Sequence, residues 1–307
     1  MLLSIVIPVY QAEHIVPELI LRLKSAVTMI TNSYEIVLVD DGSRDGSWPA
    51  IVTAGKIHPE ISALKLSRNF GQQHAITAGL DHCNGDWVIV MDCDLQDRPE
   101  EISNLYNKAL EGYDIVFARR SNRKDSFWTK SFSGIFYRLY SYLTGVKQDP
   151  AVANFGIYSR KVITIINNMK EPMRAFSSMA RWVGFSKTSI EVEHGKREGS
   201  KSSNTTSKKI NLALDMMLSY SDKPLKLIVS IGFIIAFAAF IAAINLLYRY
   251  FRGEIAVLGY TSIVISVWFL GGVIIFILGV IGLYIAKIFS GVKNRPLYII
   301  DEKLNCK

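Results

Sequence analysis

Two aspartates, Asp92 and Asp94, follow directly after the short apolar stretch from Trp87 to Met91. The β-branched residues of this stretch predict a strand that is buried on both faces, as in a parallel sheet. Two carboxylates this close repel each other unless a cation lies between them. At the carboxyl end of a strand they can bind a hard divalent ion, and a diphosphate can complete its coordination. The same pattern also suits a polar turn that leaves a strand, so the surrounding sequence has to decide.

The elements that would position this pair come from an alternation of short apolar runs with stretches of helical spacing. We expect strands at residues 2–9, 35–39, 61–66, 87–91 and 114–118, and helices at residues 13–30, 69–82 and 99–110. This order predicts an α/β domain with a mainly parallel sheet, in which ligands bind beyond the carboxyl ends of the strands. Tyr10, Asp40 and Asp41 follow two of the predicted strands. We therefore expect them to share a nucleotide site with Asp92 and Asp94.

The composition predicts a membrane protein. Half of the 307 residues are hydrophobic, and the mean hydropathy of +0.21 is too high for an ordinary soluble chain of this length. The excess lies in residues 227–248 and 263–286, each long enough to cross a bilayer. Together they predict a transmembrane hairpin with a short loop at residues 249–262. The net charge of +8 suits anionic partners such as phosphates and lipid headgroups.

Lysine and arginine residues flank the outer ends of the predicted hairpin, so the positive-inside rule places both ends in the cytoplasm. We expect a multi-pass protein of the cell inner membrane whose α/β domain is cytoplasmic. The expected divisions are a cytosolic domain at residues 1–207, an amphipathic juxtamembrane helix at residues 208–226 and a cytoplasmic tail at residues 287–307.

Two further stretches point towards the membrane surface. Aromatic residues interleaved with cations predict an interfacial helix within residues 125–145, although an ordinary core helix has the same spacing. The basic, glycine-rich stretch from His194 to Ser203 can clamp a phosphate through Arg197 and Lys201, but it also suits a solvated linker.

Other classes of protein are disfavoured. Three cysteines without a CxxC pair imply neither a disulfide framework nor a zinc site. The first residues lack a basic region and a cleavage site, so we expect no signal peptide. The basic residues form no known nucleic-acid-binding motif, so we expect no nucleic-acid partner.

Taken together, these stretches resemble glycosyltransferase family 2, which has the GT-A fold. The motifs that carry the resemblance are Ile5 to Tyr10, Val39 to Ser43 and Asp92 to Asp94. The stretches Ser67 to Gly71 and Asp94 to Glu100, with the Arg197 to Lys201 loop and the final hairpin, are similar to the polyprenyl-phosphate glycosyltransferase branch.

The resemblance implies roles for individual residues. A divalent metal ion, Mg²⁺ or Mn²⁺, is implied as the cofactor. Asp94 and Arg119 are the implied catalytic residues. One departure is Asn154, where family members usually carry aspartate, and it leaves the identity of the sugar open. The implied ligands are Pro8, Tyr10, Asp40, Asp41 and Asp92 for the nucleotide-sugar, Asp92, Asp94 and Gln96 for the metal, and Arg119, Arg197 and Lys201 for the acceptor phosphate.

The resemblance also implies an activity. It is the inverting transfer of a sugar from a nucleotide-sugar, with UDP expected, to a polyprenyl phosphate, with undecaprenyl phosphate expected. The product would be a lipid-linked sugar for the cell envelope or for O-antigen modification. Family analogy permits a homotetramer. Two alternatives stay open: transfer to a sugar hydroxyl in polysaccharide synthesis, and a catalytically idle, membrane-anchored binding protein.

Overall fold

The computed structural model describes residues 1–120, 152–169, 171, 174–193, 195, 223–252 and 259–306. The chain forms two compact units. The first combines residues 1–137, 146–203 and 295–307, and the second combines residues 138–145 and 204–294.

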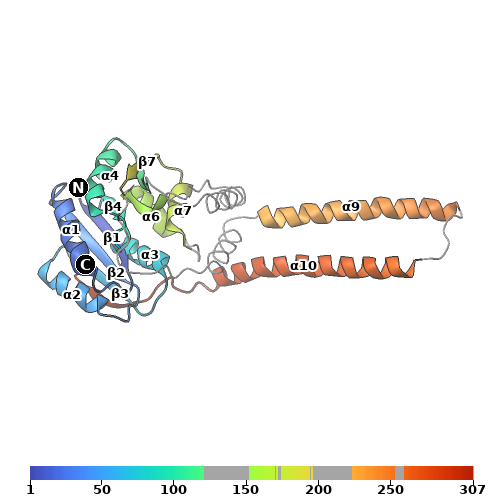
Figure 1. Ribbon diagram of the computed structural model, residues 1–307, viewed down its shortest axis with the longest axis horizontal. Coiled ribbons are helices and arrows are strands. Elements are labelled where there is room, and N and C mark those ends of the chain that lie inside the picture. The colour runs from blue at the N-terminus through green and yellow to red at the C-terminus, as the bar shows by residue number, and fades with distance from the viewer. Residues whose placement is uncertain are drawn as a thin grey trace. The chain divides into compact units, whose positions relative to one another are not determined.

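The first unit is built on one mixed sheet with the strand order β7-β5-β6-β4-β1-β2-β3-β8 (Figure 1). The strands are β1 (Leu3–Val9), β2 (Tyr34–Asp40), β3 (Ile61–Leu66), β4 (Trp87–Val90), β5 (Ile115–Arg120), β6 (Val152–Ser159), β7 (Lys187–Val192) and β8 (Ile300–Leu304). β6 and β8 run antiparallel to their neighbours, and the other described neighbours pair in parallel. All described strands except β6 and β8 therefore end at one edge, here called the carboxyl edge.

Helices cover both faces of the sheet and enclose two apolar cores. One face carries α1 (Val16–Thr28), α2 (Ser47–Ile57), η1 (Pro99–Glu101) and α4 (Ile102–Leu110), and the other carries α3 (Gln72–His82), α6 (Arg160–Asn168) and α7 (Phe176–Trp182). Successive residues of β1 alternate between the cores: Ile5 and Ile7 pack into the first, and Val6 packs into the second. Burial on both faces explains why this strand is a continuous apolar run.

One predicted helix begins later than its sequence suggests. We expected a helix from residue 69, but α3 begins at Gln72. The backbone N–H groups of Phe70 and Gly71 donate to the carboxylate of Asp41 at 2.7 and 2.9 Å. Gly71 also has a φ of +98°, a conformation that a helix does not allow. The bond to Asp41 thus sets the start of α3.

Part of the predicted cytoplasmic tail at residues 287–307 forms an edge strand of the sheet, and its cytoplasmic location stays a prediction. β8 pairs antiparallel with β3, so that Leu304 lies opposite Ala63. The side-chain nitrogen Nδ2 of Asn305 donates to the carbonyl oxygens of Gly55 and Ile61 at 2.8 and 2.9 Å. The strand reads Ile-Asp-Glu-Lys-Leu, and its middle residues are exposed. Because an edge strand of this kind buries little apolar surface, hydrophobic periodicity does not reveal it.

The described part of the second unit consists of two long helices, α9 (Lys223–Phe251) and α10 (Tyr260–Val292). Within the described residues, one helical stretch, Ser266–Val292, is long and apolar enough to cross a membrane. The apolar stretch in α9, Leu225–Ile241, is shorter. Both predicted spans fall inside helices, and the transmembrane hairpin stays a prediction. The predicted helix at residues 208–226 lies outside the described residues up to residue 222, and its last four residues begin α9.

Candidate active site

Pro8 separates β1 from β4 at the carboxyl edge. The carbonyl of Val6 accepts from Met91 N–H at 3.2 Å on the β4 side, and that of Val9 accepts from Asp41 N–H at 2.8 Å on the β2 side. Because these directions alternate along a strand, Pro8 faces β4, and proline has no N–H to donate. Pairing with β4 accordingly stops two residues before Pro8, whereas pairing with β2 continues to the end of β1. The chain after β4 can therefore leave the sheet at the point where the strand order reverses, which is where open α/β sheets bind ligands.

The loops that follow β1 and β2 are hydrogen-bonded to each other. The N–H of Gln11 donates to Ser43 Oγ at 3.0 Å, and the N–H of Gly46 donates to Glu13 Oε2 at 3.0 Å. Tyr10 precedes these contacts and leaves 44% of its surface exposed. These hydrogen bonds hold the two loops together at the carboxyl edge, beside the accessible ring of Tyr10.

Asp40 and Asp41 are both buried, but their carboxylates differ in bonding. Both oxygens of Asp41 accept from the backbone of the chain entering α3, as described above. For Asp40, Oδ1 accepts from Ser43 N–H at 3.3 Å, and Oδ2 is buried with no hydrogen-bond partner among the described residues. Burial raises the pKa of both carboxyls. Asp41 is thus bonded as a structural residue, whereas Asp40 retains an unused acceptor.

The aspartates that follow β4 are fixed by different neighbours. Gln72 Nε2 donates to Asp92 Oδ1 at 2.6 Å, and the backbone N–H of Asp92 donates to Asp97 Oδ2 at 3.3 Å. Asp94 Oδ1 accepts from the backbone N–H of Gln96 at 3.2 Å. The intervening Leu95 has a φ of +58°, which is uncommon for a branched residue. The turn holding Asp94 and Gln96 is therefore tight, and both carboxylates lie in one short segment at the carboxyl edge.

The cysteine between the two aspartates does not contribute a nucleophile. Burial raises the pKa of the Cys93 thiol to about 12, and the negative charge of Asp92 acts in the same direction. A thiol in this environment stays protonated at neutral pH and is inert as a nucleophile.

The chain leaving β7 lies against the turn that contains Gln96. The backbone N–H of Gly195 donates to the Gln96 carbonyl at 2.9 Å. A Cβ placed on Gly195 would come within 2.7 Å of the Leu95 carbonyl oxygen, so only glycine fits this close approach.

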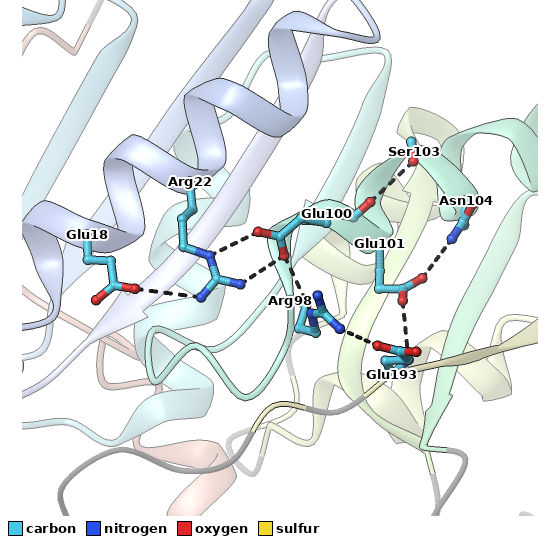
Figure 2. Close-up of polar contacts among 8 residues, drawn as sticks. All are labelled: Glu18, Arg22, Arg98, Glu100, Glu101, Ser103, Asn104 and Glu193. Atoms are coloured by element: carbon cyan, nitrogen blue, oxygen red, sulfur yellow. Dashed lines mark hydrogen bonds and ion pairs between the residues drawn. The ribbon is translucent and has the colours of Figure 1, made fainter.

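A chain of ion pairs supports this contact (Figure 2). Arg98 pairs with Glu193, which follows β7, and lies 3.8 Å from Glu100. Arg22 of α1 binds both oxygens of Glu100 at 3.0 and 2.9 Å, and Glu101 accepts from the backbone N–H of Glu193 at 3.3 Å. These groups are partly or largely exposed, so each pair contributes little stability. Their effect is geometric, because they connect α1 and η1 to the chain leaving β7.

The remaining predicted residues are distributed as follows. Arg119 is exposed near the end of β5, opposite Val152 of β6 and Glu191 of β7. It therefore shares the carboxyl edge with Asp92, although β6 separates their strands. Arg197, Lys201 and the predicted interfacial region at residues 125–145 lie outside the described residues.

A comparison with known families identifies the family of the chain. The model of glycosyl transferase family 2 matches residues 4–164, slightly more than half of the chain. The chain belongs to glycosyl transferase family 2. This family 2 glycosyltransferase is 35% identical to the glycosyltransferase YkcC of Bacillus subtilis (strain 168) over 300 residues, which cover 97% of the chain and 93% of the relative.

A second relative specifies the branch of the family. The chain is 34% identical over 303 residues to the undecaprenyl-phosphate 4-deoxy-4-formamido-L-arabinose transferase of Photorhabdus laumondii subsp. laumondii, covering 97% of this chain and 93% of that protein. The resemblance to polyprenyl-phosphate glycosyltransferases is thereby confirmed.

Among solved structures, the glycosyltransferase is similar to mannosyl-3-phosphoglycerate synthase from Rubrobacter xylanophilus, with a TM-score of 0.51 and 15% identity. The match covers 71% of this chain and 72% of the other. The predicted α/β fold of GT-A type is confirmed.

The side-chain oxygens at the carboxyl edge of this family 2 glycosyltransferase are suited to bind a hard divalent ion together with a substrate. The described residues contain no group of three or more His, Cys, Asp or Glu side chains able to hold a metal. They do offer two carboxylates, Asp92 and Asp94, at one edge. Mg²⁺ is usually held by one or two carboxylates together with substrate phosphates, and not by a cage made of protein alone.

Gln72 and Asp97 were missed by reasoning from the sequence. Gln72 is the first residue of α3, and no spacing rule relates it to Asp92, twenty residues later. Asp97 was noted only as part of a motif, and its burial could not be foreseen. Gln72 acts through a contact between separate segments, and Asp97 acts through a contact within its own turn; hydrophobic periodicity reports neither.

Proposed function

We propose that this glycosyltransferase moves a sugar from a nucleotide-sugar, with UDP expected, to undecaprenyl phosphate, with inversion at the anomeric carbon. The observation that carries the proposal is the position of Asp92 and Asp94, directly after β4, where Pro8 parts that strand from β1. The acceptor is supported by relatives named as undecaprenyl-phosphate transferases.

The donor's base and ribose would bind beside β1 and β2. The exposed ring of Tyr10 offers a surface for stacking. Oδ2 of Asp40, which has no partner within the described part of the chain, would accept an N–H from the base, because buried polar atoms seldom go without a partner. Pro8 contributes indirectly, by opening the junction between the strands.

The donor's diphosphate would lie over Asp92 and Asp94. Asp92 and Asp94, with Gln96 nearby, would hold a divalent ion, which would supply positive charge against the leaving nucleoside diphosphate. Gln72 holds the carboxylate of Asp92, and the turn from Asp94 to Gln96 holds that of Asp94.

The acceptor phosphate needs positioning more than activation. A phosphate monoester has a second pKa near 6, so it is largely dianionic at pH 7 and requires no strong general base. Arg119 at the carboxyl edge, with Arg197 and Lys201, would hold it in line with the anomeric carbon. We propose that α10 and α9 keep the enzyme at the inner membrane, where this lipid resides, with the sheet in the cytoplasm. A tetramer stays a prediction from family analogy.

The test is an assay of the purified full-length protein with a panel of labelled UDP-, GDP- and dTDP-sugars, undecaprenyl phosphate and Mg²⁺ or Mn²⁺. We expect a label that partitions into organic solvent, and a loss of at least 100-fold in rate for Asp94→Asn, since a group that stabilises the leaving charge acts mainly in the transition state. Asp301→Asn, an exposed carboxylate on β8, is the matched control and should retain full rate.

Two outcomes would favour the alternatives. A product that stays in the aqueous phase would indicate a sugar hydroxyl as acceptor, which requires a general base. No transfer from any donor, or a fully active Asp94→Asn, would indicate a membrane-anchored binding protein.

A further inference from the structure

The carboxylate of Asp92 is held by a side chain from a different segment of the sheet edge. Gln72, the first residue of α3, donates from Nε2 to Asp92 Oδ1 at 2.6 Å. The bond joins the beginning of α3 to the segment that follows β4, twenty residues later in the chain. Gln72 is exposed, so burial of its aliphatic stem does not explain why a glutamine reaches this carboxylate.

The position of Gln72 is fixed from the opposite side by Asp41 and Gly42. Both oxygens of Asp41 accept from the two residues before Gln72. A Cβ on Gly42 would come within 2.4 Å of the backbone carbon of Arg68 and 2.7 Å of Asn69 N. The turn after β2 and the chain entering α3 therefore lie backbone against backbone, and the beginning of α3 cannot shift independently of this turn.

We propose that Gln72 is a positioning residue for Asp92, and that the turn at Asp41 and Gly42 sets Gln72 in place. The inference rests on the proposed function and adds a residue that acts through Asp92. An amide that donates to Oδ1 restricts rotation of the carboxylate. Because the amide is neutral, it does so without cancelling the negative charge of the carboxylate that would attract a divalent ion.

The type of residue is central to this inference. A lysine at position 72 can also donate to Asp92, but its positive charge competes with the cation for the same carboxylate. An alanine removes the donor and leaves the charge unaltered. The two substitutions therefore separate the geometric effect of residue 72 from its electrostatic effect.

The experiment measures calorimetric binding of UDP, GDP and dTDP, each with MnCl₂, to the purified full-length protein, together with rates of sugar transfer. For the nucleotide that wild type binds, Gln72→Ala should weaken binding about tenfold, the size expected for one bond to a charged group. Gln72→Lys should weaken it further. The KM for undecaprenyl phosphate should stay within about twofold, because Gln72 contacts the donor side.

Gln73→Ala is the matched control. Gln73 is the next residue of α3, and its Oε1 accepts from the backbone N–H of Phe176 at 2.8 Å. Its loss should lower the melting temperature and leave the affinity for Mn²⁺ with nucleotide unchanged. Gln72→Ala should show the reverse pattern.

The outcomes distinguish the inference from the proposed function. If wild type binds a nucleotide and transfers sugar while Gln72→Ala equals it, the inference alone is wrong. It is also wrong if Gln72→Ala loses affinity only in step with a fall in its melting temperature, or if Gln72→Lys binds as well as wild type. If wild type neither binds nor transfers, the proposed function fails, and the inference fails with it.

Discussion

At the scale of single residues, the site depends on two neighbouring carboxylates that the fold uses in opposite ways. Asp41 is satisfied by two backbone N–H groups, whereas Asp40 has a buried oxygen without a partner among the described residues. An ionised carboxylate at Asp40 therefore raises the free energy of the folded enzyme. We attribute this cost to the proposed donor site, where a bound base would supply the partner that this oxygen lacks.

Substitution by asparagine should therefore have opposite effects at the two positions. Asp40→Asn should raise the free energy of unfolding at pH 7 by about 1 kcal/mol, because it removes a buried charge, while weakening donor binding. Asp41→Asn should lower the free energy of unfolding by about 2 kcal/mol, because the new NH₂ group faces a backbone N–H. Thermal unfolding in detergent would measure both changes. Equal shifts of the same sign would contradict the assignment.

The gain from Asp40→Asn should depend on pH. Burial raises the pKa of Asp40 in the folded state, so the folded protein binds the proton more tightly than the unfolded chain. The contribution of Asp40 to the free energy of unfolding of the wild type is largest at low pH. It falls as the pH rises from the pKa of Asp40 in the unfolded chain, about 3.9, through its pKa in the folded protein. The advantage of Asp40→Asn should be complete above the folded pKa and absent below about pH 4.

At the scale of elements, the sequence was informative where burial is periodic and uninformative where contacts join separate segments. The apolar runs predicted β1 to β5 and most of the helices, and their ends predicted Asp92 and Asp94 as neighbours of Asp40. β8 was missed because its residues are charged and exposed, and the pairing of Gln72 with Asp92 was missed because it is tertiary. The late start of α3 has the same origin, since it depends on Asp41.

The edge strand β8 gives a test at this scale. Asn305 has a φ of +51° and donates two hydrogen bonds to carbonyls near α2 and β3. Asn305→Ala should lower the free energy of unfolding by about 2 kcal/mol and speed hydrogen exchange in β8. Both hydrogen bonds are lost, and alanine adopts this positive φ less readily than asparagine. Asn305→Gly keeps the φ and should lose less. Asn104→Ala, which removes an exposed bond on α4, should change little, and equal losses in all three variants would refute this account.

At the scale of the whole molecule, the sheet is assembled from parts of the chain on both sides of the long helices. Residues 204–294 should therefore be replaceable by a flexible linker without loss of the sheet. β7 and β8 lie at opposite ends of the strand order, a span of seven spacings or about 34 Å. A Gly/Ser linker of about 40 residues has a root-mean-square reach of roughly 35 Å.

Alkaline carbonate should extract the shortened protein from membranes. The shortened protein should still bind Mn²⁺ and nucleotide with an affinity within about threefold of that of the full chain. It should transfer sugar to a short, water-soluble prenyl phosphate and lose most transfer to undecaprenyl phosphate in vesicles. Retained activity on vesicles would show that α9 and α10 do not bring the enzyme to its acceptor.

The return of the chain as β8 also constrains how it meets the bilayer. A sheet held together by hydrogen bonds cannot be divided between two aqueous compartments, so β7 and β8 lie on the same side. Any membrane crossings made by the chain between them must therefore be even in number, whatever the charges of its flanks. If Ser266–Val292 crosses once, parity requires a return passage, and among the described residues α9 is the helix long enough to make it.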